Sequence, residues 1–269
     1  MKKGRNLRSV NTDGGVNLQF KLLSAIGIII IVSGHCYHGG MELAYNWFPP
    51  YSYNLALFVF ISGYFYKTDY EENVGKYIWK RTKRLLIPAY LWNIFYGGMV
   101  AFLGLFGFTI GAKPDLYNLF VMPFVDGVAF QYNLGSWFVY PLFLVCIINV
   151  LFRKFLKLIH LDNEFIVLIV YLAIGMIGIN TALENPTAIN GIVKLLVRTM
   201  FFLPCYEFGR FYKAVLEKKD TLNNVAYFAI IFAVQLILLT FCKDLEYTPS
   251  SFAKFNNGFI IPYISSITA

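Results

Sequence analysis

The sequence predicts an all-α polytopic integral membrane protein, a bundle of about eight transmembrane helices whose N-terminus lies inside. Three observations predict this class: the composition, the succession of apolar runs and the distribution of basic residues. Of the 269 residues, 58% are apolar, 19% are aromatic and only 14% are charged, whereas about 25% are charged in an ordinary soluble domain. A soluble globule cannot hide this much apolar surface from water, but a bilayer acts as its solvent. The composition therefore excludes a water-soluble enzyme, a disordered tail and a disulfide-stapled secreted module.

Eight apolar runs follow a polar and basic segment at residues 1–17, which we expect to lie in the cytoplasm. The first run is long enough to span a bilayer, so we expect it to stay in the membrane rather than to be cleaved as a signal peptide. Because no composition shift marks a second domain, we expect a single membrane domain over residues 1–269. The predicted spans are residues 22–36, with a start a few residues earlier, and then 51–66, 85–110, 134–152, 165–179, 192–212, 225–242 and 252–269.

The distribution of Lys and Arg between the predicted loops agrees with this division of the chain into spans. With the N-terminus inside, the outside loops hold only Lys113 and Lys243, as the positive-inside rule expects. The net charge of +8 then reflects membrane topology rather than nucleic acid binding. We therefore expect a multi-pass protein of the cell membrane. The inside segments hold Lys2, Lys3, Arg5, Arg8, Lys21, Lys67, Lys76, Lys80, Arg81, Lys83, Arg84, Arg153, Lys154, Lys157, Arg210, Lys213, Lys218 and Lys219.

The four cysteines show neither a CxxC motif nor a Cys/His ligand spacing. They lie in or beside apolar runs, where a free cysteine behaves as a small core residue. We also find no phosphate-cradling glycine loop, zinc motif or nucleophilic-serine elbow. The sequence thus predicts no metal site. The cysteines are Cys36, Cys146, Cys205 and Cys242.

His35 is the first candidate for chemistry, because it lies at the outer end of the first predicted span. An ionisable residue within a membrane usually faces the protein interior or a water-filled cavity. Histidine can act as a general base at about neutral pH, and an interfacial histidine bonded to a neighbour is an equal alternative. Lys21 lies fourteen residues earlier, which is about 21 Å along a helix, so the two side chains cannot touch. An anchor at the inner face is the favoured interpretation of Lys21, and His160 is expected to be structural.

Residues 74–84 are basic and aromatic and resemble an interfacial helix that leads into the third span. Within it, Lys80, Arg81, Lys83 and Arg84 place four cations in five positions just inside the membrane. Such a cluster suits phosphate groups by charge and by forked guanidinium hydrogen bonds. The anions could be lipid headgroups or the phosphates of a nucleotide-bearing donor, and the cluster alone favours lipid.

Three further places carry polar or small residues within apolar runs. Ser62 and Gly63 end the second span, where small residues let a neighbouring helix or a ligand chain approach, and helix packing is favoured. Arg198 needs a partner in space, either an anionic substrate or a carboxylate. Glu207 and Arg210 lie three apart, so we expect them to share a helix face and to pair.

Five short stretches occur in order over about residues 18–215. The first span ends in Val-Ser-Gly-His at residues 32–35, and the second carries Phe-Ile-Ser-Gly-Tyr at residues 60–64. Residues 84–88 read Arg-Leu-Leu-Ile-Pro after the basic segment. A Trp-Phe pair at residues 137–138 and the Pro-aromatic-Phe-Gly stretch within residues 203–209 follow. Each motif is weak, but in this order the five stretches together resemble the membrane-bound acyltransferase family 3.

The resemblance implies transfer of an acyl group, usually acetyl from acetyl-CoA, to a hydroxyl of a sugar or another cell-envelope molecule. It implies about ten helices, so this shorter chain is expected to be a fragment or a member lacking the last two or three. A prokaryotic membrane fits it best. It also implies that His35 acts as general base or in acyl relay. Members carry Arg or Lys eleven residues before this histidine; here Ser24 stands there, and Lys21, one turn earlier on the same face, is the candidate replacement.

The combined prediction is an O-acetyltransferase that acts on an envelope glycan or a related hydroxyl acceptor, with acetyl-CoA and membrane lipid as its other partners. His35 is the predicted catalytic residue. A transporter or flippase of a polar or lipid-linked molecule is the alternative, and a structural membrane subunit is a third. The predicted substrate-binding residues are Lys21, Lys80, Arg81 and Arg84 for the donor phosphates, and Ser62, Trp137 and Arg198 along the path to the acceptor.

Overall fold

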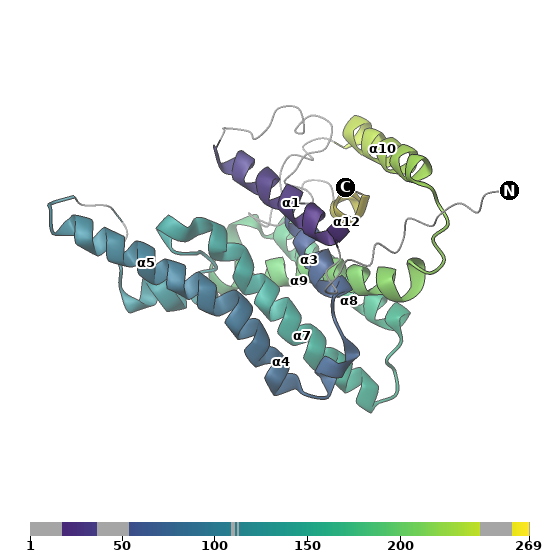
Figure 1. The fold of residues 1–269 in the computed structure, drawn as a ribbon, viewed down its shortest axis with the longest axis horizontal. Coiled ribbons are helices and arrows are strands. Elements are labelled where there is room, and N and C mark those ends of the chain that lie inside the picture. Colours follow the sequence, from purple (N-terminus) through teal and green to yellow (C-terminus); the bar gives the residue numbers. More distant parts are fainter. Residues whose placement is uncertain (1–17, 37–53, 109–110, 112, 243–259, 269) are drawn as a thin grey trace.

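The computed structural model describes residues 18–36, 54–108, 111, 113–242 and 260–268. Within these ranges every regular element is helical (Figure 1), which confirms the all-α class. Four helices among them are long and apolar enough to cross a membrane: Val74–Gly104, Gln131–Leu158, Glu164–Glu184 and Asn224–Phe241.

The predicted spans correspond to helices, although their ends differ. The first helix begins four residues before the predicted start, as expected, and the second is only 11 residues long in the described range. The last predicted span falls partly on residues 252–259, which lie outside the described residues. The main helices are α1 (Leu18–Cys36), α3 (Asn54–Tyr64), α4 (Val74–Arg81), α5 (Ile87–Gly104), α7 (Val139–Leu158), α8 (Glu164–Glu184), α9 (Gly191–Phe211), α10 (Asn224–Phe241) and α12 (Ile261–Thr268). Short turns are η2 (Thr68–Glu71), η3 (Thr82–Leu86), η4 (Tyr117–Val121), α6 (Met122–Val125), η5 (Gln131–Phe138), η6 (Pro186–Ala188) and η7 (Tyr212–Leu216).

The basic segment leads directly into the third predicted span, because α4 continues through the π-helical turn η3 into α5 as one helix of 31 residues. Pro88 lies two residues after the end of this turn, as the second residue of α5. Proline has no N–H to donate and its ring clashes with the carbonyl four residues earlier, and the wider π turn accommodates it. The helix ends at Gly104 rather than near residue 110, and Gly107 has a left-handed φ of +84°.

The helix α9 lies at the centre of the bundle and packs against α3, α7 and α8. Its backbone touches the backbone of α3 at two glycines. A Cβ on Gly63 would lie 1.8 Å from the Tyr206 carbonyl oxygen, and one on Gly209 would lie 2.1 Å from the Phe60 carbonyl oxygen. Only glycine fits at such a distance, so the helix-packing interpretation of Gly63 is confirmed.

The predicted core role of the cysteines holds where their side chains are described. Cys146 on α7 and Cys205 on α9 are free and buried, and Cys242 is half-buried. The side chain of Cys36 lies outside the described residues. His160 is exposed and has a φ of +55°, a conformation typical of the residue that ends a helix, which agrees with its predicted structural role.

The predicted outside loop after α5 contains helical turns that the apolar pattern did not reveal. Asn93 on α5 is fully buried, and its Nδ2 donates to the Leu119 carbonyl oxygen at 2.7 Å. Asn133 Nδ2 in turn donates to Asn93 Oδ1 at 2.7 Å. These bonds fold η4, α6 and the start of η5 back onto α5.

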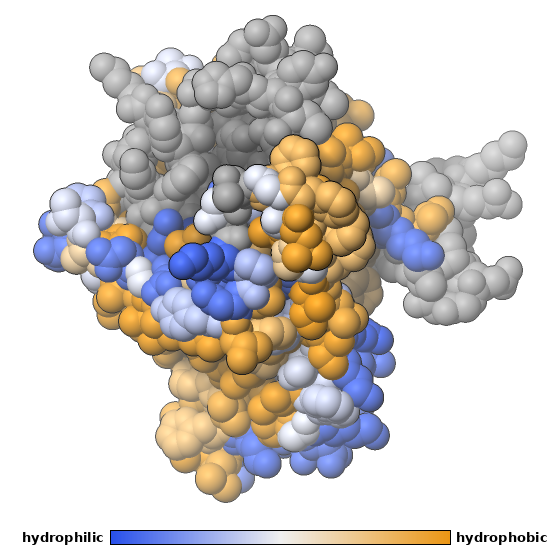
Figure 2. Space-filling view, turned by 90° about the vertical axis from the view of Figure 1, so that its left-hand side faces the viewer, coloured by the Kyte–Doolittle hydropathy of each residue, from blue (hydrophilic) through white to orange (hydrophobic). Residues whose placement is uncertain are grey.

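Large apolar areas are exposed on the surface. In Figure 2 apolar residues lie across much of the face, while hydrophilic residues form one group from its left side to its middle and another towards its lower right. On α5, Leu91, Trp92, Phe95 and Phe102 are each more than half exposed. Such a helix surface is stable in lipid and not in water.

Candidate functional site

Polar residues gather at two opposite ends of the bundle. Trp137 and Arg198 lie at one end, which we call the Trp137 end. Arg153 and Arg210 lie at the other, which we call the Arg210 end. Helix α9 carries Arg198 and Arg210 twelve residues apart, about 18 Å along its axis at 1.5 Å per residue.

At the Trp137 end the fold brings together two of the predicted site residues. The Arg198 guanidinium carbon lies 4.1 Å from the centroid of the Trp137 ring. Its Nη1 donates to the Gly127 carbonyl oxygen at 2.8 Å, and the residue is 5% exposed. The ring face and the carbonyl offset part of the cost of removing a cation from water. A Cβ on Gly127 would lie 2.5 Å from the Gly191 carbonyl oxygen, so glycine is required at the turn that presents this carbonyl.

Helix α1 leads towards the same end. It runs antiparallel to α3, since the Phe20 ring lies 4.3 Å from that of Tyr64, at the end of α3, whereas Gly27 lies against Phe58, near its start. The Phe58 ring is 6.5 Å from the Phe138 ring, the neighbour of Trp137. The last turn of α1 therefore points to the Trp137 end. That turn contains His35, whose side chain lies outside the described residues, as does all of His38.

Lys21 and Ser24 lie on the first half of α1. Lys21 is exposed, and by helix length it is far from the last turn, as predicted. The Ser24 hydroxyl donates to the Phe20 carbonyl oxygen at 2.7 Å and so is satisfied within its own helix. Ser62 is half-buried on α3, about 6 Å along the axis from Phe58.

At the Arg210 end, buried ion pairs join α7, α8, α9 and η2. Arg153 Nη2 lies 2.5 Å from Glu207 Oε1 and 2.6 Å from Glu164 Oε2. Arg210 lies 2.8 Å from Glu164 and 3.7 Å from Glu71. The predicted pairing of Glu207 with Arg210 is therefore wrong: neighbouring helices supply each with a different partner.

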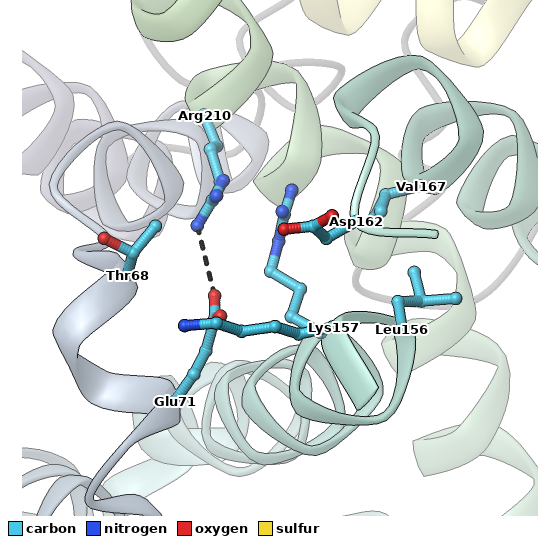
Figure 3. A pocket seen from close by; sticks show the side chains of 8 residues that line it. Thr68, Glu71, Leu156, Lys157, Asp162, Val167 and Arg210 are labelled. Carbon is cyan, nitrogen blue, oxygen red and sulfur yellow. Dashed lines mark ion pairs between the residues drawn. The ribbon is translucent and has the colours of Figure 1, made fainter. Parts of the chain in front are cut away.

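The sequence counts Arg153 among the basic residues of the inside segments, and the structure shows that it is only 2% exposed. The signal that could have identified it is its spacing from Asn149, four residues earlier in an apolar helix and also fully buried. Two polar residues at this spacing share a helix face. A small cavity of about 60 Å³ lies beside the ion pairs. Figure 3 shows Arg210 and Glu71 pointing towards each other across it, with Lys157 and Asp162 on its wall.

The basic segment splits into two groups. Lys80 Nζ donates to the Tyr70 hydroxyl at 3.2 Å, and Arg81 Nε donates to the Tyr77 hydroxyl at 3.0 Å. Helix side chains lean towards the N-terminus, which brings these two cations back onto the tyrosines. Lys83 and Arg84 are exposed. The four cations are thus divided into a pair held on tyrosine side chains and a pair exposed at the surface.

A second and larger cavity, about 230 Å³, opens at the Arg210 end beside Lys80. Its aromatic wall is made by Tyr70 and Tyr77, whose rings stack at 4.6 Å with an interplanar angle of 29°. The lining residues are Asp69, Tyr70, Asn73, Lys76, Tyr77 and Lys80.

Tyr66 connects this cavity with the buried ion pairs. The Arg210 guanidinium lies 5.0 Å from the Tyr66 ring centroid, and the Tyr66 and Tyr77 rings meet edge to face at 5.9 Å. Burial, followed by the charge of Glu71, raises the pKa of Tyr66 well above its usual range. Its hydroxyl donates to Glu71 Oε1 at 3.4 Å.

No group of three His, Cys, Asp or Glu side chains suited to a metal ion occurs in the part of the chain that the structure describes.

Comparison with known proteins gives one match. A family model described as an acyltransferase domain, that of acyltransferase family 3, matches residues 17–266. Neither the curated proteins nor the solved structures gave a match. The matched range covers nearly the whole chain and confirms the resemblance found in the motifs, so the chain belongs to acyltransferase family 3.

Proposed function

We propose that this acyltransferase moves an acetyl group from acetyl-CoA to a hydroxyl of a cell-envelope carbohydrate or a related acceptor. Family membership over residues 17–266 carries the proposal, because it makes acyl transfer to carbohydrate-type acceptors the expected reaction. Polar residues at two opposite ends of the bundle support it, since donor and acceptor would come from opposite sides of a membrane.

The Arg210 end is proposed to face the cytoplasm, together with the N-terminus. Exposed basic residues gather there, and such residues collect on the cytoplasmic side. The Trp137 end would then face outwards, in a cell membrane. The exposed cations of the predicted inside segments between residues 67 and 219 are Lys67, Lys76, Lys83, Arg84, Lys154, Lys157, Lys213, Lys218 and Lys219.

Donor phosphates are proposed to bind at the Arg210 end. Lys80 is held beside a cavity by Tyr70, and Arg81 is held next to it by Tyr77. Arg84 and Lys21 are exposed and free to turn towards a large anion. Ammonium and guanidinium groups bind phosphate oxygens through charge-assisted hydrogen bonds.

The acceptor is proposed to bind at the Trp137 end, beside Arg198. His35 would take the proton of the acceptor hydroxyl as general base. The hydroxyl oxygen would attack the thioester carbonyl carbon, an ester C–O bond would form, and the C–S bond would break. The thiolate of coenzyme A would leave and receive a proton, so that atoms and charge balance. The pantetheine arm, or an acyl-enzyme relay, would cross the interval near Ser62 between the two ends.

Label transfer in sealed inside-out vesicles tests the proposal. Radiolabelled acetyl-CoA is supplied at the exposed cytoplasmic face, and alkali-labile label is counted in envelope carbohydrate. Alkali-labile acetyl label in the acceptor is the expected result. Passage of an acceptor across the vesicle membrane without acetylation would instead establish a transporter, and would overturn the proposal.

A further inference from the structure

The cavity lined by residues 69–80 combines three kinds of group. Lys76 and Lys80 lie four apart on α4, a spacing that puts both ammonium groups on one helix face. Asp69 and Asn73 stand before α4 on the chain and supply oxygen and amide groups. Tyr70, stacked on Tyr77, supplies the aromatic wall.

Lys80 is held in place rather than left mobile. Its Nζ lies 5.0 Å from the centroid of the Tyr70 ring in addition to the 3.2 Å hydrogen bond to the hydroxyl of that residue. Tyr77 is itself only 2% exposed and is braced by Tyr66 and by the Tyr206 hydroxyl at 3.4 Å. A preorganised cation loses less conformational entropy when it binds an anion.

The volume of the cavity limits its occupant. Pockets that bury a drug-sized ligand measure about 300–1,000 Å³, so a cavity of about 230 Å³ holds part of such a molecule. A phosphorylated nucleoside uses all three kinds of group: its phosphates bind ammonium ions, the exocyclic amine of its base donates to Asp or Asn oxygens, and its ring packs against an aromatic side chain. An anionic lipid headgroup such as phosphatidylglycerol has no aromatic ring to pack against Tyr70.

The cation that suits lipid lies elsewhere on the same helix. Lys83 is exposed, and its Nζ lies 5.1 Å from the ring centroid of Trp79, which is 55% exposed. An exposed tryptophan with a basic neighbour is typical of a membrane interface. On this helix Lys83 is therefore suited to lipid headgroups, whereas Lys80 lines the cavity.

We propose that the cavity binds the phosphorylated nucleoside end of the acyl-CoA donor. Lys76 and Lys80 bind the phosphates, and Asn73 and Asp69 face the base. This assignment rests on the proposed function for the identity of the donor, and it names a binding position that the family match does not give.

The test measures binding of coenzyme A to the full chain in nanodiscs of zwitterionic lipid. Lys76→Gln and Lys80→Gln each remove one charged contact and are expected to raise the Kd about tenfold, the factor for about 1.4 kcal/mol. With 3′-dephospho-coenzyme A, which lacks one phosphate, at least one of the two variants is expected to raise the Kd by a smaller factor than with coenzyme A. Lys83→Gln, a matched change on the same helix, is expected to leave the Kd unchanged.

The outcomes separate this proposal from the reaction itself. If the wild type binds coenzyme A and both cavity variants keep its Kd, the cavity assignment is wrong while acetyl transfer stands. The same conclusion follows if Lys83→Gln weakens binding of coenzyme A as much as the cavity variants do. It also follows if Lys76→Gln and Lys80→Gln leave the Kd of coenzyme A unchanged and reduce only the increase in protein stability that anionic lipid produces, since the cavity would then be a headgroup site. If the cavity variants lose affinity but the wild type transfers no acetyl group, the nucleotide site stands and the proposed reaction fails.

Discussion

Replacement of Gly63 by alanine tests how the bundle is held together. The new Cβ would lie 1.8 Å from the Tyr206 carbonyl oxygen, whereas carbon and carbonyl oxygen atoms in contact lie about 3.3 Å apart. Helices α3 and α9 would have to separate by about 1.5 Å, because the obstacle is backbone and cannot rotate away. Overpacking of a core by one carbon typically costs 1–3 kcal/mol, and we expect the upper end, about 3 kcal/mol.

The assay is thermal unfolding of the purified protein in detergent, followed by tryptophan fluorescence. At about 2–4 °C per kcal/mol for a chain of this size, Gly63→Ala is expected to lower the Tm by roughly 6–12 °C. Gly98→Ala is the matched control, because an added Cβ there meets no atom within 4 Å, and it is expected to leave the Tm unchanged or to raise it slightly. Equal Tm values for the two variants would refute the close backbone crossing.

Three further changes probe the polar residues. Arg153→Met leaves the buried Glu207 carboxylate without its guanidinium, so the free energy of unfolding should fall by about 3–5 kcal/mol. The double variant with Glu207→Met should recover most of this loss in the same melting assay. Failure to recover it would show that the ion pair is not the cause. Asn93→Ala should cost about 1–3 kcal/mol, because the buried Leu119 carbonyl loses its donor, and an unchanged melting temperature would contradict this. Trp137→Ala should raise KM for the acceptor several-fold while the Kd of coenzyme A stays constant; the opposite pattern would place Trp137 on the donor side.

The helices were predictable because apolar runs of this length have few alternatives to a membrane helix. The predicted ends of helices were wrong where backbone geometry ends a helix. The apolar run continues to residue 110, but α5 ends at Gly104 and Gly107 has a left-handed φ. The fold of residues 117–125 was missed because its cause is a buried amide, Asn93, twenty-six residues from the carbonyl it binds.

The site was only partly predictable. Trp137 and Arg198 were each identified from the sequence, but their contact depends on how η5, which carries Trp137, lies against α9, which carries Arg198. The spacing of Glu207 and Arg210 permits a pair, yet carboxylate and guanidinium groups on neighbouring helices are closer. A charge count by membrane side also cannot distinguish an exposed cation from the buried Arg153.

Acetyl transfer by the His35→Ala variant tests the central claim most directly. The rate of label transfer from acetyl-CoA to envelope carbohydrate is compared with that of the wild type in inside-out vesicles, at equal amounts of folded protein. Loss of a general base is expected to lower this rate at least about 100-fold, with the Kd of coenzyme A unchanged. Transfer at the wild-type rate would contradict the account.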